Sequence, residues 1–396
     1  MFKSKNLLIL TSEYPDCENK IIGDPFVKSQ VDLLAKYFKN VYVISVRPYF
    51  PQFLSRLLKF NLSNLKNYSY NNIKVYYPKI LDFPVDYFRK RRGDRYFKVV
   101  DKLIKKEKIK FDLIHAHFTY PPGYVGIKLK EKYGKPLVVT AHGGDIYKLP
   151  FISNYWRNKV SRVLKKADKV ITVSKRNANC IRTLGFKSII IPNGFDQNLF
   201  FPQDKIKCRK KLNLPLDKKI ILTIGSLVEI KGQKYLVSAM KTIVQYNKHI
   251  VCYIVGDGEL KNDLNKQIEE LSLKDYIKLV GARPHSEIPI WMNACDLFVL
   301  PSLSESFGIV QVEAIACGIP IIATKNGGSE EIIISKEYGL LCEPGNPKDL
   351  SKKILIALNK KWDKNKILKY SKKFMWNKIV KDIIRCYISV LYSNLF

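Results

Sequence analysis

Short apolar runs alternate with amphipathic stretches along the whole chain. A helix over about 25–38 follows the first run, and the same alternation resumes in the second half from residue 220. Strands that alternate with helices in this way are typical of parallel sheets covered by helices on both faces. The predicted strands are 6–10, 41–45, 113–116, 136–140, 169–173 and 188–191, followed by 220–224, 251–255, 277–280, 297–300 and 319–323.

The alternation stops near Ile191-Pro192-Asn193-Gly194, and a loop through Phe201-Pro202 leads to the second series. Single hydrophobic cores rarely grow past roughly 250 residues, so a chain of 396 residues is expected to form two domains. We therefore predict an α/β protein of two Rossmann-like, doubly wound parallel-sheet domains that face each other across a cleft. The expected boundaries are 1–195 and 196–374, with a final helical segment over 375–396.

The composition is that of a globular protein able to bury a sizeable core, with 46% hydrophobic and 26% charged residues. Eight cysteines are scattered without a C-x-x-C pair, which argues against both a disulfide framework and a metal site. The opening apolar run is too short for a signal peptide, and no stretch has the length of a membrane span. We expect a cytoplasmic protein.

Lysine and arginine total 69 against 35 acidic residues, a formal net charge of +34. A field of this size attracts anionic partners such as membrane lipid, nucleic acid or phosphorylated substrates. A compositional bias that only decorates the surface is the alternative, and the charge alone leaves both open. Nucleic-acid binding would call for a known module or for interleaved basic and stacking aromatic residues, and neither is evident.

One segment of the first half combines apolar and basic positions. Arg56 and Lys59 lie beside an apolar stripe, and a cationic run, Arg89-Lys90-Arg91-Arg92, follows further on. Such a basic amphipathic segment would lie in an anionic membrane interface and attach the protein peripherally to the membrane. The alternative is that the stripe packs onto the sheet and the cations are merely solvated. The apolar positions at helical spacing are Phe50, Phe53, Leu54, Leu57 and Leu58.

In doubly wound sheets, ligands gather at the carboxyl ends of strands, where helix N-termini offer unpaired N–H groups to an anion. In the first half, Gly23 lies between a strand and a helix and would let backbone approach a diphosphate, although a plain turn is the alternative. In the second half, strand 220–224 runs into Gly225, Ser226 and then Lys231, whose ammonium group would neutralise phosphate charge. An ordinary surface lysine is the alternative for Lys231.

Two carboxylates, Glu305 and Glu313, lie eight positions apart where a strand is expected to close and a helix to open. At about 1.5 Å rise per residue they would be on the order of 12 Å apart, near the distance from a hexose across a diphosphate to a ribose. Glu305, at the helix entrance, would accept bonds from sugar hydroxyls, and Glu313 from ribose. A helix-start acid and a surface glutamate are the alternative. The amides expected to face the diphosphate are those of Phe307, Gly308, Ile309 and Val310.

This stretch resembles the E-x7-E motif of glycosyltransferase family 4, the retaining enzymes of the two-domain GT-B architecture. Other segments are similar to the family's pattern in the same order along nearly the whole chain. They are Ile191-Pro192-Asn193-Gly194-Phe195-Asp196, Lys231-Gly232, Gly256-Asp257-Gly258, Pro301-Ser302, the run from Glu313 to Pro320, and Gly327-Gly328-Ser329-Glu330-Glu331.

The resemblance implies a hexosyl transfer from a nucleotide diphosphate sugar to a glycan or lipid-linked acceptor, with retention at the anomeric carbon. It also implies that His142 lies beside the donor sugar and that the final helix crosses back to the first domain. Family members often carry Arg where this chain has Ser226, so Lys231 would act with Arg283 or with backbone amides. Sugar phosphorylase and nucleotide-sugar epimerase remain alternatives on the same fold.

We expect no metal cofactor. No Asp-x-Asp pair, which often holds a divalent ion against a sugar nucleotide, occurs in the sequence. His115 and His117 would form a metal pair only with a third ligand, and none is evident. We expect one of these two histidines to face the cleft and the other the core. Charge on the leaving diphosphate would then be met by Lys231, helix N-termini and loop amides.

Overall fold

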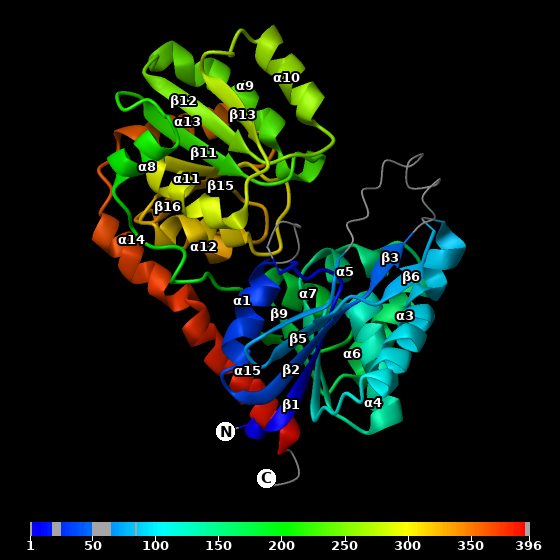
Figure 1. Cartoon of the computed structure of the whole chain (residues 1–396). Coiled ribbons are helices and arrows are strands. Elements are labelled where there is room, and N and C mark those ends of the chain that lie inside the picture. The colour runs from blue at the N-terminus through cyan, green and yellow to red at the C-terminus, as the bar shows by residue number, and fades with distance from the viewer. Residues whose placement is uncertain (1, 18–24, 50–64, 84, 393–396) are drawn as a thin grey trace. The chain divides into compact units, whose positions relative to one another are not determined.

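The structure is a computed structural model that describes residues 2–17, 25–49, 65–83 and 85–392. The chain forms two compact units, one of Met1–Pro192 with Asn377–Phe396 and the other of Asn193–Trp376. Each unit contains a large sheet of mainly parallel strands with helices on both faces (Figure 1). The predicted fold class, two Rossmann-like α/β units, is confirmed.

In the first unit, the central strand β1 (Phe2–Thr11) pairs in parallel with β2 (Phe38–Ser45) on one side and with β7 (Leu113–His117) on the other. The chain therefore reverses its direction of growth beside β1. The sheet order is β10-β9-β8-β7-β1-β2-β5-β4, and only the β4–β5 pair is antiparallel. The further strands are β4 (Tyr68–Tyr70), β5 (Ile73–Tyr76), β8 (Leu137–Ala141), β9 (Lys169–Thr172) and β10 (Ile189–Ile190).

Four short strands between β2 and the next predicted strand were not predicted. They are β4, β5 and the two strands of a separate parallel ribbon, β3 (Arg47–Tyr49) and β6 (Lys79–Leu81). The expected helix over 25–38 was also too long, because α1 (Pro25–Leu34) ends four residues earlier and Phe38 begins β2. Phe38 is buried and stacks on Phe2 with ring centroids 5.0 Å apart, so pairing with β1 overrides the local helical pattern.

Helices cover both faces of the first sheet. One face packs against α3 (Asp86–Lys106), α4 (Tyr124–Tyr133) and part of α6 (Asn154–Lys166). The final helix, α15 (Trp376–Leu391), belongs to this unit from Asn377 onward. It is amphipathic, and its buried side includes Tyr387, whose ring meets Phe38 edge-on at 6.0 Å. The shorter helices are α5 (Gly144–Tyr147) and α7 (Lys175–Thr183).

The second unit has six parallel strands in the order β13-β12-β11-β14-β15-β16. Five were predicted, and the edge strand β16 (Gly339–Cys342) was not. The other strands are β11 (Lys219–Ile224), β12 (Ile250–Val255), β13 (Ile277–Gly281), β14 (Leu297–Leu300) and β15 (Ile321–Thr324). The helices are α8 (Lys205–Lys211), α9 (Gln233–Tyr246), α10 (Lys261–Glu270), α11 (Ile288–Ala294), α12 (Ile309–Ala316), α13 (Pro347–Asn359) and α14 (Lys364–Ser371).

The segments that enter and leave the second unit lie side by side. The Phe195 N–H donates to the Phe374 carbonyl at 3.0 Å, and the Trp376 N–H donates to the Phe195 carbonyl at 3.2 Å. Both segments are thus fixed to each other, and the second unit begins and ends beside them, at Asn193 and Trp376.

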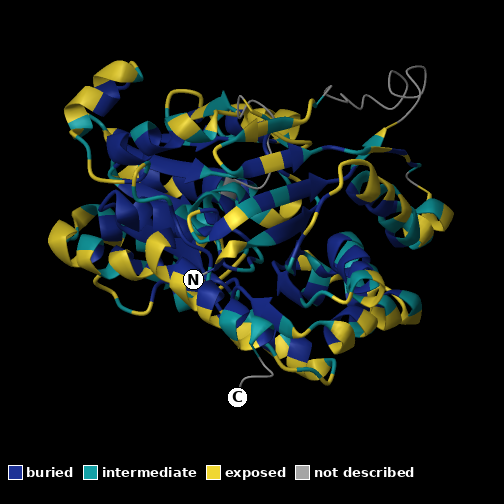
Figure 2. Ribbon diagram, turned by 60° about the horizontal axis from the view of Figure 1, so that its bottom comes forward, coloured by how far each residue is buried: buried dark blue, intermediate teal, exposed yellow. Residues whose placement is uncertain are grey.

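The strands of both sheets are largely buried, whereas exposed residues lie mainly on the outer sides of the helices (Figure 2). Strands buried on both faces read as continuous apolar runs, which is why the sequence located them well. Within the described ranges, no helix has both the length and the apolar character needed to cross a membrane.

Candidate active site

The second unit contains a topological switch point between β11 and β14. These two strands are neighbours, and β12 and β15 extend the sheet in opposite directions from them. Open parallel sheets bind ligands at this place, outside the carboxyl ends of the strands. Gly225 follows β11 and Pro301 follows β14, so the loops singled out in the sequence leave the sheet side by side.

Two glycines let these loops approach each other closely. Gly232, at the N-cap of α9, has φ +65°, and a Cβ there would lie 2.2 Å from the Pro301 carbonyl oxygen. A Cβ at Gly256, directly after β12, would lie 1.9 Å from the Gly225 carbonyl oxygen, so this third loop also packs closely against the loop after β11. The Leu303 N–H also donates to the Ile230 carbonyl at 2.8 Å. No other residue type fits at Gly232 without moving the loop that carries Lys231.

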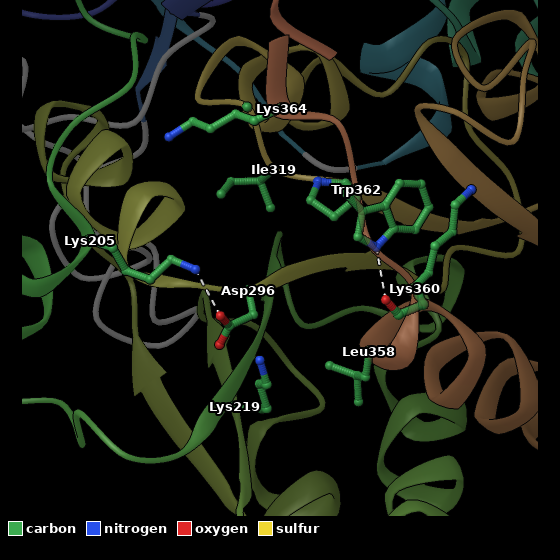
Figure 3. Close-up of a pocket in the computed structure, with 11 residues that line it drawn as sticks. Lys205, Lys219, Asp296, Ile319, Leu358, Lys360, Trp362 and Lys364 are labelled. Atoms are coloured by element: carbon green, nitrogen blue, oxygen red, sulfur yellow. Dashed lines mark hydrogen bonds and ion pairs between the residues drawn. The ribbon is translucent and has the colours of Figure 1, made fainter. Parts of the chain in front are cut away.

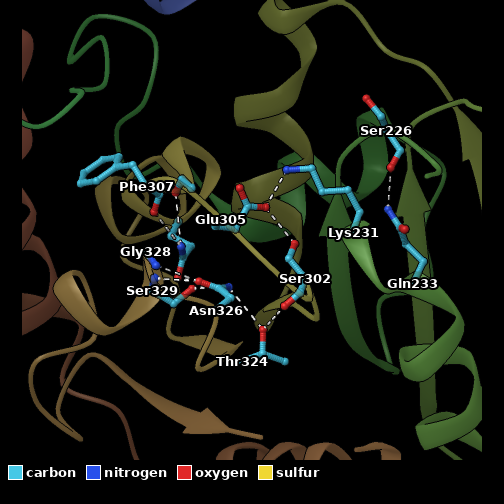
Figure 4. A network of polar contacts seen from close by, with 12 residues as sticks. Ser226, Lys231, Gln233, Ser302, Glu305, Phe307, Thr324, Asn326, Gly328 and Ser329 are labelled. Carbon is cyan, nitrogen blue, oxygen red and sulfur yellow. Dashed lines mark hydrogen bonds and ion pairs between the residues drawn. The ribbon is translucent and has the colours of Figure 1, made fainter. Parts of the chain in front are cut away.

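Lys231 and Glu305 form an ion pair at this site. The Lys231 Nζ lies 2.6 Å from Glu305 Oε1, and the Ser302 hydroxyl donates to the same oxygen at 2.8 Å (Figure 4). The Glu305 side chain is 10% exposed and that of Lys231 29%. The pair is therefore shielded from bulk water on the carboxylate side but open on the ammonium side, where an anionic ligand would approach.

A network of amide and hydroxyl groups fixes the backbone around Glu305. The Glu305 N–H donates to the Asn326 carbonyl at 3.1 Å, while the Asn326 side chain accepts from the N–H groups of Gly328 and Ser329 (Figure 4). A Cβ at Gly328 would lie 2.9 Å from the Phe307 backbone. The Gly327-Gly328 segment thus supports the loop that leads into α12.

Helix α12 begins at Ile309, so Glu305 is not at the helix entrance as expected but in the loop four residues earlier. The estimated separation from Glu313, which assumed a continuous helix, therefore does not apply. Gly308 at the N-cap has φ +82°, the left-handed conformation that breaks the helix there. The first-turn amides, including those of Ile309 and Val310, have no acceptor within the helix by position and can bind an anion.

Glu313 has a partner that the sequence did not suggest. The His285 Nε2 lies 3.0 Å from Glu313 Oε1, and the Glu313 side chain is 7% exposed. Although burial lowers the pKa of His285, its hydrogen bond to Glu313 and the charge of that carboxylate raise the pKa above its usual value. The bond to His285 thus holds the Glu313 carboxylate in one orientation. The position of His285 shortly after β13 was the available signal.

The remaining predicted donor residues lie at different places in the structure. Gly225 and Ser226 lie in the loop after β11, and the Ser226 carbonyl accepts from the Gln233 side chain at 3.0 Å. Arg283 is exposed, two residues before His285. Gly23 lies outside the described residues.

The first unit carries a second polar group of residues, His115, His117 and His142, which we call the histidine cluster. His115 bonds with Tyr387 at 2.6 Å and with Thr140 at 2.8 Å, and His117 Nδ1 lies 2.9 Å from His142 Nε2. His115 and His117 were expected to face opposite ways, which is wrong. Residues two apart on a strand share a face, and both side chains are fully buried.

The histidine cluster is neutral. Burial lowers the pKa of all three imidazoles, that of His117 to about 3, and proximity to other imidazoles adds to the effect at His115 and His142. A single N–H therefore joins the His117 and His142 rings. In the described structure, His142 Nδ1 is buried without a hydrogen-bond partner. Asp145 fixes the loop by accepting from the N–H groups of His142, Gly143 and Thr119.

Comparison with known proteins assigns the family. The model for group 1 glycosyl transferases matches residues 204–374, and that for glycosyltransferase family 4 matches 40–199. An uncharacterised glycosyltransferase of Methanocaldococcus jannaschii is 33% identical over 83% of this chain and 90% of its own length. The chain belongs to glycosyltransferase family 4.

A Bacillus subtilis protein, named for a proposed glycosyltransferase role in teichuronic acid biosynthesis, is 31% identical over 88% of each chain. The solved structure of Anabaena Alr3699/HepE in complex with UDP-glucose is 22% identical, covers 97% of this chain and 100% of its own, and has a TM-score of 0.72. This last similarity concerns the fold. Taken with the family, it makes the protein a transferase of the GT-B fold class.

Within a glycosyltransferase, the two polar groups suit different tasks. The Lys231–Glu305 pair offers a cation and a carboxylate at the switch point, in the loops that follow β11 and β14. The histidine cluster offers a neutral imidazole nitrogen. Among the described residues, no group of three or more His, Cys, Asp or Glu side chains could hold a metal ion.

Proposed function

We propose that the enzyme moves a hexosyl group from a nucleotide diphosphate sugar to a glycan or lipid-linked acceptor, with retention at the anomeric carbon and without a metal. The observation that carries this proposal is the Lys231–Glu305 pair beside the first turn of α12. The diphosphate binds the Lys231 ammonium group and the amides of Phe307, Gly308, Ile309 and Val310. The sugar hydroxyls bind Glu305, and the ribose hydroxyls bind Glu313.

The second unit supports this assignment through its charge arrangement. Donors that are already oriented where charge develops stabilise a leaving diphosphate without reorganisation. Lys231 is oriented by Glu305, which is itself held by Ser302 and by the backbone of Asn326. When a donor arrives, its phosphate competes for the Lys231 ammonium group and frees one Glu305 oxygen for the sugar.

His142 is proposed to bind a sugar hydroxyl through its Nδ1 atom. That nitrogen is buried and lacks a partner in the described structure, and a buried polar atom of this kind calls for one. Because the imidazole is neutral, it orients the sugar and does not act as an acid. The leaving phosphate oxygen takes the proton of the acceptor, so no side-chain base is required.

Thermal-shift screening of UDP, GDP and ADP with their sugars identifies the donor, since a ligand that binds the folded state raises the melting temperature. NMR of the product then gives the anomeric configuration. An inverted product would exclude retention. Release of free nucleotide diphosphate only when acceptor is added separates transfer from a sugar phosphorylase, which needs phosphate, and from a nucleotide-sugar epimerase, which releases none.

A lipid-linked acceptor at an anionic membrane is the second part of the proposal. The apolar stripe from Phe50 to Leu58 lies outside the described residues. In the cationic run of α3, Arg92 pairs with the buried Asp82 at 2.6 Å and Lys90 pairs with Asp86 at 2.7 Å. These two side chains thus already form ion pairs within the unit. Arg89 and Arg91 are exposed, and the Arg91 guanidinium lies 4.3 Å from the centroid of the exposed Tyr87 ring, an aromatic and basic surface that suits a lipid interface.

Co-sedimentation with anionic liposomes tests the membrane part. Arg89→Glu with Arg91→Glu should abolish binding at low salt, because each cation near such a surface contributes about 1 kcal/mol. Lys105→Glu with Lys106→Glu, at the other end of α3, is the control of matched charge. Equal loss in both variants, or no binding of the unmodified enzyme, would leave an enzyme that takes a soluble acceptor.

A further inference from the structure

The second unit contains a basic pocket far from the Lys231–Glu305 pair. It has a volume of about 230 Å³ and lies where β11, β14 and β15 begin (Figure 3). Lys219 is the first residue of β11, and Gly225 follows its last residue. Six steps along a strand at about 3.3 Å each place the two ends roughly 20 Å apart. The basic pocket is therefore separate from the proposed donor site.

Four lysines line the basic pocket, from four different segments of the unit. They are Lys205, Lys219, Lys360 and Lys364, and the carboxylate among the lining residues is Asp296. Asp296 is already neutralised, because it accepts from Lys205 at 2.8 Å and from the buried Arg209 at 2.7 Å. The ammonium groups of Lys219 and Lys364 have no hydrogen-bond or ion-pair partner among the described residues. The pocket thus presents uncompensated positive charge.

The wall opposite these cations is apolar and ordered. The Trp362 indole N–H donates to the Ala357 carbonyl at 2.8 Å, which fixes the ring, and Lys360 lies 4.1 Å above it (Figure 3). Ile319 and Leu358 extend this surface. The Lys364 stem lies against Gly318, where a Cβ would come within 2.7 Å of it, so Gly318 keeps that side of the pocket open. A ring-sized group packs well against such a wall.

We propose that the basic pocket binds a small phosphorylated anion, a phosphate ester of a single ring such as a hexose monophosphate. Lysine ammonium groups bind phosphate as point charges, and Lys219 and Lys364 supply them, whereas the Lys360 ammonium group already donates to the Lys336 carbonyl. The volume equals roughly that of seven or eight water molecules, which accommodates one ring and its phosphate but not a nucleotide sugar. This site is independent of the proposed donor site and of its chemistry.

Calorimetric titration of the full-length enzyme at about 0.15 M salt tests the proposal. The probes are a hexose monophosphate, inorganic phosphate and sulfate, with tryptophan fluorescence recorded in parallel. We expect saturable binding of the ester with a Kd below about 1 mM. Trp362→Phe should abolish the fluorescence change, since the other three tryptophans lie outside the pocket.

Charge variants test whether the anion binds in the basic pocket. Lys219→Glu with Lys364→Glu should weaken binding tenfold or more, and the milder pair Lys219→Ala with Lys364→Ala should weaken it less. The control pair, Lys241→Glu with Lys352→Glu, changes the net charge equally at exposed positions outside the pocket and should alter the Kd by less than threefold. A melting temperature near that of the unmodified enzyme verifies that each variant is folded.

Three results would overturn the proposal. Equal weakening in the control pair would show non-specific attraction to a basic surface, and loss of binding in Lys231→Ala alone would place the anion at the donor site. An absence of binding by all three probes would equally exclude it. If inorganic phosphate binds as tightly as the ester, the ion itself is the ligand and the site stands. Tighter binding of the ester assigns a role to the Trp362 wall.

Discussion

The Lys231–Glu305 pair and the histidine cluster both lie at the carboxyl edges of parallel sheets, yet they are opposite in electrostatic character. The pair is charged and partly open to water, whereas the cluster is fully buried and neutral. A diphosphate needs a cation that remains charged. Its binding site therefore requires an ammonium group that keeps some contact with solvent. A sugar hydroxyl needs only a hydrogen bond, which a buried imidazole provides without carrying charge.

This division also predicts opposite responses to pH. Burial lowers the pKa of the histidine cluster, whereas Glu313 raises that of His285 in the second unit. Residues of one type therefore report on two different environments. The predictions below use this contrast, beginning with the change expected to have the largest effect.

Replacement of Lys231 should have the largest effect on activity. Lys231→Ala removes an oriented cation from the leaving diphosphate, and the loss of one such contact typically lowers turnover about a hundredfold or more. Steady-state kinetics measure kcat, with Lys241→Ala as a control at an exposed lysine of the same unit. EDTA should leave the rate unchanged. A strict requirement for added magnesium or manganese, together with near-normal turnover of Lys231→Ala, would contradict the metal-free assignment.

The two carboxylates should separate turnover from nucleotide binding. Glu305→Ala is expected to lower kcat about tenfold to a hundredfold, because it removes a group at the reacting sugar and the anchor of Lys231. Glu313→Ala should instead weaken binding of free nucleotide diphosphate about tenfold, the scale of one hydrogen bond to a charged group. Titration of free nucleotide diphosphate into each variant measures its affinity and tests this prediction. Equal losses of nucleotide affinity would defeat this division of roles.

The histidine cluster should make the first unit sensitive to acid. Because the pKa of His117 is about 3 in the folded unit and near 6.5 when unfolded, the unfolded state binds more protons between these values. The free energy of unfolding should therefore fall as pH drops below about 6.5, by at most about 1.4 kcal/mol per pH unit for each such histidine. Hydrogen exchange of β7 and β8 measures this locally.

His117→Gln should flatten that dependence, since it removes one of the protonation sites. His249→Gln, at an exposed histidine of the second unit, should leave it unchanged and serves as the control. If the exchange rates in β7 respond to pH equally in all three proteins, then the buried histidines do not set the acid sensitivity.

The smallest expected effect concerns His285 and has the opposite sign. Its pKa is raised in the folded unit, so its pairing with Glu313 stabilises the structure fully below about pH 6.5 and is lost as pH rises through the folded value. The change should be under about 1 kcal/mol, because the His285 side chain is 34% exposed. Hydrogen exchange of the α12 amides between pH 6 and 8 measures this change in stability. Glu313→Gln should abolish the trend, and a trend that survives this substitution would rule out the pair as its source.

The two regions also show which structural features a local sequence pattern can predict and which it cannot. The buried strands and the ordered motifs around Lys231, Glu305 and Glu313 were readable because each is a short contiguous signal. Strands β3, β4, β5, β6 and β16 were missed. They are three or four residues long and, unlike the equally short β14 and β15, are not buried along their whole length. Strand pairing and not composition makes such segments extended.

The sequence by itself thus determined the fold class, the family and the type of residue at each candidate position. Only the tertiary structure decided which of these residues meet. His285 contacts Glu313 across 28 positions, Lys231 contacts Glu305 across 74, and Tyr387 contacts His115 across 272. Side-chain periodicity fixes which face a residue lies on within its own strand or helix. Its partner depends on the order of strands in the sheet, which long-range packing of the whole unit sets.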